Sequence, residues 1–343
     1  MPANPRASLP WPSWRSLATP LLACLAMATL AVGCDGCTKA GRLRAGGDHP
    51  YVRCMTVDEP AVNQWTVGDL QLNTEGRVLS IGGLDGALRM AAFVGPGPGS
   101  ADPSAAIAAI APLGAQVTWV LGELGDSEAH ALCTLRALAA APGLSLVLAS
   151  GRDDFEVLEE AWDALDDAAR SHVIDLRPFH AVRVGDTVFA LTSGGAGGRY
   201  ARNRSACGYD EDDLDDVEDS LPDADEARRY MVSWAAPAGG VARDQSGTDG
   251  GDPTLSEFMR EAGITGGIFA WPPHAAWMAT RVTAEGAVLM DDRAADPAAQ
   301  VVVGRIAGPP VERRDGSRAP NGAVVLELRE GGLAILSHAP SGP

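Results

Sequence analysis

Between Ala87 and Ser171 the chain alternates short apolar runs with helical segments, and this alternation constrains the fold most strongly. Apolar runs begin at Ala87, Gln116 and Leu144, and helical patterns occupy residues 102–113, 126–143 and 153–171. A buried strand needs neighbouring strands to complete its backbone hydrogen bonds. A helix of this length can carry the chain back to the start of the sheet, so that the next strand runs parallel to the last. The sequence therefore predicts an α/β fold.

The second half of the chain is richer in strands. Expected strands occupy residues 179–194, 230–240, 265–273, 301–308 and 322–338, with a short helix over 254–263. Asp210 to Glu226 holds eleven carboxylates but lacks the glycine that a calcium loop needs at its sharp turn. Because Leu214 and Val217 recur at helical spacing, this segment is expected to be an acidic helix rather than a calcium site.

The N-terminus resembles an export signal. Arg6 and Arg15 precede an apolar run over residues 17–32, and small residues lead to Cys34. This pattern is similar to a bacterial lipobox, which implies cleavage before Cys34 and lipidation of that cysteine. The expected organisation is a signal peptide over 1–33, a flexible tether over 34–64 and one domain over 65–343. The expected location is the bacterial cell envelope, on the periplasmic or surface side, with the membrane as partner through the lipid.

Net charge, cysteine content and one serine motif limit the possible partners and chemistry of the chain. The formal net charge of −18 argues against a nucleic-acid partner, because phosphates are bound through basic patches. Cysteines in an exported chain can form disulfides, and a local pair between Cys37 and Cys54 is one option, but the connectivity stays open. Ser127 opens a helix within Gly-Asp-Ser and is expected to cap that helix rather than to act as a nucleophile.

Five loops that follow predicted strands carry the candidate site, because ligands of α/β sheets bind at the carboxyl ends of strands. They contain Gly95-Pro96-Gly97, Gly122 to Asp126, Gly151-Arg152-Asp153-Asp154, Ser233-Trp234 and Trp271 to His274. Their order and spacing resemble the calcineurin-like metallophosphoesterases over roughly Leu88 to Leu336. That family carries DxH, GDxxD, GNH[DE], a lone histidine and GHxH at strand ends. The resemblance implies an α/β/β/α sandwich of two mixed sheets flanked by helices, with a two-metal site.

Carried onto this sequence, the resemblance places few ligands at the metal positions. The DxH ligands fall on Gly95 and Gly97, and the bridging acid of GDxxD falls on Glu123. The asparagine and histidine of GNH[DE] fall on Arg152 and Asp153.

The remaining motifs are similarly altered. The second acid of GDxxD falls on Asp126 and the acid of GNH[DE] on Asp154. The lone histidine falls on Trp234 and the first histidine of GHxH on Trp271, while His274 lies one residue out of register with the second.

These replacements argue against metal catalysis. Two divalent cations need several anionic and imidazole ligands, whereas a guanidinium is a fixed cation and cannot coordinate metal. Arg152 is therefore expected to pair with Glu123, and with Asp126 as a further partner. The favoured hypothesis is a non-catalytic pseudoenzyme, a binding or scaffold protein whose protein or small-molecule partner is unidentified, without a cofactor or metal. The alternative is an active phosphoesterase, a metal-dependent hydrolase with rearranged ligands from Glu123, Asp126, Asp153, Asp154 and His274.

Overall fold

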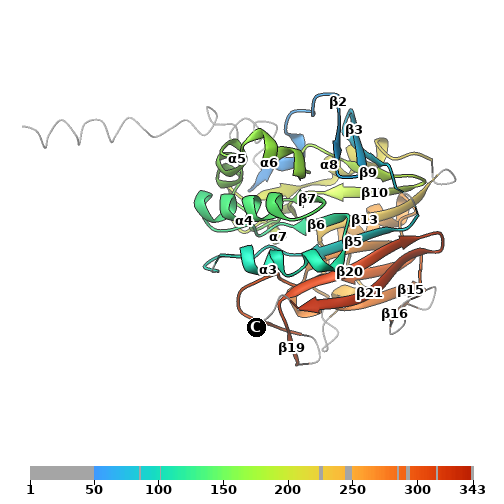
Figure 1. The fold of residues 1–343 in the computed structure, drawn as a ribbon. Coiled ribbons are helices and arrows are strands. Elements are labelled where there is room, and N and C mark those ends of the chain that lie inside the picture. The colour runs from blue at the N-terminus through green and yellow to red at the C-terminus, as the bar shows by residue number, and fades with distance from the viewer. Residues whose placement is uncertain are drawn as a thin grey trace, which may run out of the picture.

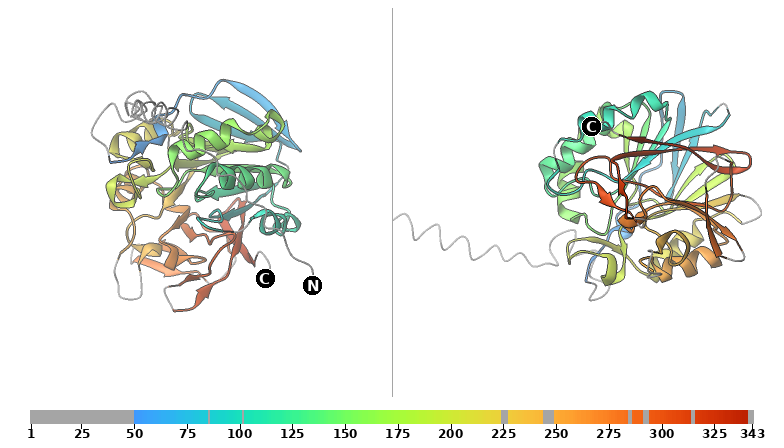
Figure 2. Two further views of the ribbon diagram at one scale, coloured as in Figure 1. Left: turned by 90° about the vertical axis from the view of Figure 1, so that its left-hand side faces the viewer. Right: turned by 90° about the horizontal axis from the view of Figure 1, so that it is seen from below.

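The computed structural model describes residues 50–84, 86–100, 102–223, 227–243, 249–283, 286–290, 294–313 and 316–340. Two mixed β-sheets pack face to face, and helices lie on the outer face of each sheet (Figure 1). The view from below shows the teal and green helices beyond one sheet and the yellow and orange helices beyond the other (Figure 2). This arrangement confirms the predicted α/β fold class with two mixed sheets flanked by helices.

The smaller sheet contains the alternating strands of the first half of the chain. Its order is β21 (Gly332–Pro340), β20 (Gly322–Arg329), β5 (Leu88–Phe93), β6 (Val117–Leu121), β7 (Leu144–Leu148) and β8 (Val173–Asp175). Strands β5 to β8 run parallel, as the alternation with helices predicts. Strands β20 and β21 form an antiparallel hairpin on the β5 edge, so the single strand expected over 322–338 is two strands around a turn.

The larger sheet has ten strands among the described residues. Its order is β16 (Gly286–Leu289), β15 (Ala279–Thr283), β17 (Ala299–Val302), β14 (Gly266–Trp271), β13 (Arg228–Ala235), β10 (Thr187–Thr192), β9 (Ala181–Val184), β4 (Val78–Gly82), β3 (Leu70–Glu75) and β2 (Asn63–Val67). Strands β10, β13, β14 and β17 run parallel at its centre. Strands β9 and β10 form the expected hairpin.

One apolar core lies between the two sheets and another beneath each set of helices. Trp119 of β6 meets Phe189 of β10 across the sandwich, with ring centroids 5.3 Å apart. The smaller sheet is covered by helices α3 (Ser104–Ala108), α4 (Glu128–Ala140), α5 (Phe155–Asp163) and α6 (Asp167–His172). The larger sheet is covered by helices α8 (Glu211–Asp219) and α9 (Pro253–Glu261).

One expected helix is divided in two, and the expected acidic helix forms. The segment expected as one helix over 153–171 is α5 and α6, because Asp166 accepts a hydrogen bond from the Ala169 amide and starts a new helix. The acidic run forms α8, with Leu214 and Val217 buried against the sheet as predicted. Among the described residues, no helix is long and apolar enough to cross a bilayer.

The domain begins earlier than the sequence predicts. β1 (Val52–Arg53) pairs with β12 (Cys207–Tyr209), which also pairs with β11 (Gly195–Ala196). Cys54 forms a disulfide with Cys207, so the local pair with Cys37 was wrong. The tether expected over 34–64 therefore does not extend over residues 50–64. The expected signal peptide, Cys34 and residues 35–49 lie outside the described residues.

Candidate functional site

The carboxyl ends of parallel strands from both sheets meet at one edge of the sandwich. A parallel bridge between Val94 and Arg305 joins the end of β5 to the segment after β17. A second bridge, between Ser150 and Gly194, joins the end of β7 to the end of β10. The five loops selected from the sequence therefore converge where α/β folds place their ligands.

Glu123 is at the centre of these loops, immediately after β6. Its side chain is buried, and its backbone adopts a positive φ of 57° directly after Gly122. The Glu123 carbonyl accepts a hydrogen bond from the Gly97 amide at 3.0 Å. A Cβ at Gly95 would lie 2.5 Å from the same carbonyl oxygen. The backbone approach thus requires glycine at position 95, where the resemblance expects a metal ligand.

The carboxylate of Glu123 lies between two guanidinium groups. Arg152 Nη1 is 3.5 Å from one carboxylate oxygen, which agrees with the predicted pairing. Arg305, on the segment after β17, forms a charge-assisted hydrogen bond with the other oxygen. A Cβ at Gly97 would lie 3.0 Å from the Arg305 guanidinium carbon, so this glycine makes room for that side chain. The buried negative charge is compensated on both sides.

The sequence interpretation missed Arg305. Gly304-Arg305 follows the apolar run 301–303 in the same way that the other candidate loops follow their strands. Its place directly after a predicted strand could have identified Arg305 as a site residue, but the resemblance assigns no motif to that loop.

Two tryptophans extend the site from Arg152 into the core. The Arg152 guanidinium carbon lies 4.5 Å from the ring centre of Trp271, a cation–π distance. Trp271 stacks on Trp234 with ring centroids 5.1 Å apart and an interplanar angle of 26°. A Cβ at Gly151 would come within 3.0 Å of Trp234. The two indoles thus fill the positions where the resemblance expects histidines.

Asp153 is enclosed beneath these loops. It is 3% exposed, and its Oδ2 accepts hydrogen bonds from the amides of Ser150 at 2.7 Å and Glu123 at 2.9 Å. Burial raises the pKa of Asp153 to about 6, although the two amides act in the opposite direction. Asp154 instead caps α5 by accepting from the Glu156 and Val157 amides.

Asp126 and His274 do not join the cluster around Glu123. Asp126 contacts His130 Nδ1 at 2.6 Å, an i,i+4 pair at the start of α4, and this hydrogen bond lowers the pKa of Asp126. The predicted additional pairing of Asp126 with Arg152 was therefore wrong. His274 lies on a 3-10 turn over Pro273–Ala275, close to Gly250.

A pocket of about 640 Å³ opens above the cluster. Glu123, Arg152 and Asp153 form part of its lining, with Arg202 and Asn203 from the loop before β12. The pocket is polar and carries charges of both signs, with the Arg152 side chain 36% exposed. Its volume lies within the range of small-molecule sites.

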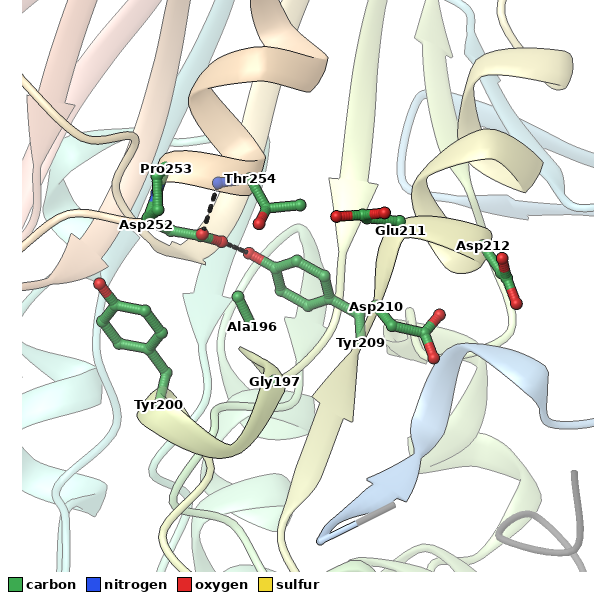
Figure 3. A pocket seen from close by; sticks show the side chains of 10 residues that line it. All are labelled: Ala196, Gly197, Tyr200, Tyr209, Asp210, Glu211, Asp212, Asp252, Pro253 and Thr254. Atoms are coloured by element: carbon green, nitrogen blue, oxygen red, sulfur yellow. Dashed lines mark hydrogen bonds between the residues drawn. The ribbon is translucent and has the colours of Figure 1, made fainter. Parts of the chain in front are cut away.

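A second pocket of about 440 Å³ lies between the starts of α8 and α9 (Figure 3). The Tyr209 hydroxyl donates to Asp252 at 2.6 Å, and Asp252 also accepts from the Thr254 amide as the cap of α9. Burial raises the pKa of Tyr209, so the phenol keeps its proton and its donor role. Each polar group of this pair has a partner, which identifies a structural contact rather than a free ligand site.

The side chains at the strand ends do not fit a pair of divalent cations. Across the described ranges, no three His, Cys, Asp or Glu side chains are grouped to hold a metal ion. Glu123 is bound to two guanidinium groups, Asp153 is enclosed by backbone amides, and Asp154 caps a helix. A cation placed at Glu123 would meet Arg152 and Arg305 at close range and be repelled.

No protein-family model matches the chain, and no curated protein matches its sequence. A crystal structure of TT1561 from Thermus thermophilus is similar at 12% identity, over 75% of this chain and 100% of that chain, with a TM-score of 0.48. Another crystal structure is similar at 10% identity, over 73% of this chain and 99% of that chain, with a TM-score of 0.44.

Proposed function

We propose that this protein is a non-catalytic relative of the calcineurin-like metallophosphoesterases whose strand-end pocket binds a ligand without a metal. The observation that carries the proposal is the Glu123 carboxylate held between Arg152 and Arg305. Two guanidinium groups supply the positive charge that metal ions supply in that family. They leave the remaining glycine, tryptophan and aspartate positions without a coordinating role.

The pocket above the cluster supports a binding role. Arg152 is fixed by Glu123 on one side and by Trp271 on another, so its exposed guanidinium face is oriented in advance. Preorganised donors lose little conformational entropy when a ligand binds. Arg202 and Asn203 add exposed donors at the rim. The ligand class is a small molecule or a protein segment that presents hydrogen-bond acceptors.

We further propose that the chain is an exported lipoprotein of the bacterial cell envelope, anchored through Cys34. The support is the N-terminal pattern of arginines, apolar run and cysteine. The disulfide between Cys54 and Cys207 agrees with an oxidising compartment. Mass spectrometry of the N-terminal peptide from membranes tests the anchor, because a Cys34→Ser variant cannot carry the lipid.

The active-phosphoesterase alternative makes a different prediction for the same site. It requires metal bound through Glu123 and the neighbouring carboxylates, and hydrolysis of phosphate esters. The purified full chain, incubated with Mn²⁺ or Zn²⁺, would be analysed for bound metal and for turnover of bis(p-nitrophenyl) phosphate. We expect no tightly bound metal at the site and no turnover above that of Glu123→Gln. Two retained metals per chain with turnover that Glu123→Gln abolishes would refute the proposal.

A further inference from the structure

The outer face of the larger sheet carries a polar hollow to one side of the parallel central strands. It lies over β2, β3, β4 and β9, which are neighbours at one end of the sheet (Figure 1). The hollow measures about 510 Å³. Helices α8 and α9 pack on the central strands β10, β13, β14 and β17, whereas the outward side chains here remain exposed or half-buried.

The side chains of this hollow form rows in register across the strands. Gln64 is opposite Asn73, Asn73 is opposite Ser80, and Ser80 is opposite Arg183. Since neighbouring strands lie about 4.8 Å apart, this row of four hydrogen-bonding groups spans roughly 15 Å.

A second row lies one pleat further along the strands. Thr66 is opposite Gln71, which is opposite Gly82. The missing side chain at Gly82 deepens the hollow between the rows.

The chemistry of this face differs from that of the rest of the chain. The chain has only ten asparagines and glutamines, and three of them line this hollow. It has 45 acidic residues, yet Arg183 is the single charged side chain among those lining the hollow. Glu75 lies on the same outward face of β3, two residues beyond Asn73, so it is the lining of the hollow that lacks carboxylates.

The β2–β3 arm is also held in place. The Trp65 indole donates to the Ser171 carbonyl of α6 at 3.2 Å, from the opposite face of β2. Thr74 Oγ donates to the Ala61 carbonyl and accepts from the Asn63 amide, which fixes the start of β2. The amide rows are thus presented on a firm support, which lowers the entropic cost of binding.

We infer that this hollow is a second binding site, for a neutral polyhydroxylated chain, that is, a glycan. Primary amides and hydroxyls each offer both donors and acceptors, as sugar hydroxyls require. The absence of carboxylates favours an uncharged ligand over a basic one, and a lone arginine is too little for a polyanion. An extended ligand lying across four strands would meet a new pair of polar groups at each step. This site is independent of the strand-end pocket.

Nuclear magnetic resonance with ¹⁵N-labelled protein tests the inference directly. Cellohexaose, maltohexaose and chitohexaose would each be titrated to millimolar concentrations while the side-chain NH₂ signals of Gln64, Gln71 and Asn73 are followed. We expect saturable shifts of these signals with at least one hexasaccharide. The triple variant Gln64→Ala, Gln71→Ala, Asn73→Ala should lose about tenfold or more in affinity.

Glu128→Ala is the control, because it changes an exposed side chain on α4, which covers the outer face of the other sheet. It should bind as the unchanged protein does. Equal binding by the triple variant, or no shift of the three NH₂ signals with any of the hexasaccharides, would overturn the inference. Neither result depends on the metal content or turnover of the strand-end site.

Discussion

Asp153 makes the stability of this protein depend on pH in a direction opposite to that of an ordinary surface carboxylate. Its folded pKa of about 6 lies above the usual value of 3.8, because burial disfavours the charged form. A raised folded pKa means that the stabilising contribution is complete below the unfolded pKa and is lost as the pH rises through the folded pKa. Since one pKa unit corresponds to about 1.4 kcal/mol, ionised Asp153 at neutral pH costs the fold about 3 kcal/mol.

The Asp153→Asn variant isolates this effect. An asparagine carbonyl can still accept from the Ser150 and Glu123 amides, but the side chain no longer ionises. Between pH 4 and pH 7 the unchanged protein should lose about 2.5 kcal/mol of unfolding free energy relative to this variant.

Urea unfolding of both proteins, followed by tryptophan fluorescence at several pH values, measures this difference. Titrations of all other groups are common to the two proteins and cancel in it. A difference that stays constant over the range would show that Asp153 has the same pKa in the folded and unfolded states. A difference that favours the unchanged protein as the pH rises would show that the two amides outweigh burial, and either result refutes the reasoning.

Four further variants test other parts of the structure. Replacing both Cys54 and Cys207 by serine opens a cross-link over a sequence separation of 153, which should lower the unfolding free energy by up to about 5 kcal/mol. An unchanged urea midpoint would contradict it. Glu123→Gln leaves two guanidinium groups without their carboxylate and should cost about 3 to 5 kcal/mol, whereas Arg152→Gln, at a half-exposed position, should cost much less. Equal losses of unfolding free energy in the two variants would show that the Glu123 carboxylate is not the buried centre of the charge cluster. Trp234→Ala should cost about 3 to 5 kcal/mol in thermal unfolding, and a loss below about 1 kcal/mol would show that the indole is not packed as described.

The apolar runs in the sequence were enough to predict the parallel strands and the loops that follow them. The buried runs that became β6 and β7 specify adjacent parallel strands, and adjacent strands bring their following loops together. For this reason the contact between Arg152 and Glu123 could be expected from the sequence. The additional partner Asp126 was wrong because His130, one helical turn away, is a nearer neighbour than any residue of another loop.

Long-range pairing accounts for what the sequence did not indicate. β1 joins β12 across more than half of the described chain, and strands of two and three residues have no periodicity to detect. The partner of Cys54 depends on that pairing, since β1 brings the next residue beside Cys207. The amide rows of β2, β3, β4 and β9 likewise need the order of strands in the sheet, which alternation of side chains along one strand does not specify.

On the proposed relationship to the metallophosphoesterases, the geometry around Glu123 corresponds to a rebuilt site rather than to one merely left without ligands. Removing metal ligands one by one would leave a buried carboxylate uncompensated, at a cost of several kcal/mol. Here Arg305 reaches that carboxylate only because position 97 has no side chain to block it. Arg152 completes the pair from the opposite loop and is supported in turn by Trp271. These side chains depend on one another, so Arg152→Asn, which introduces the asparagine that the proposed relatives carry there, should weaken the fold without creating affinity for metal.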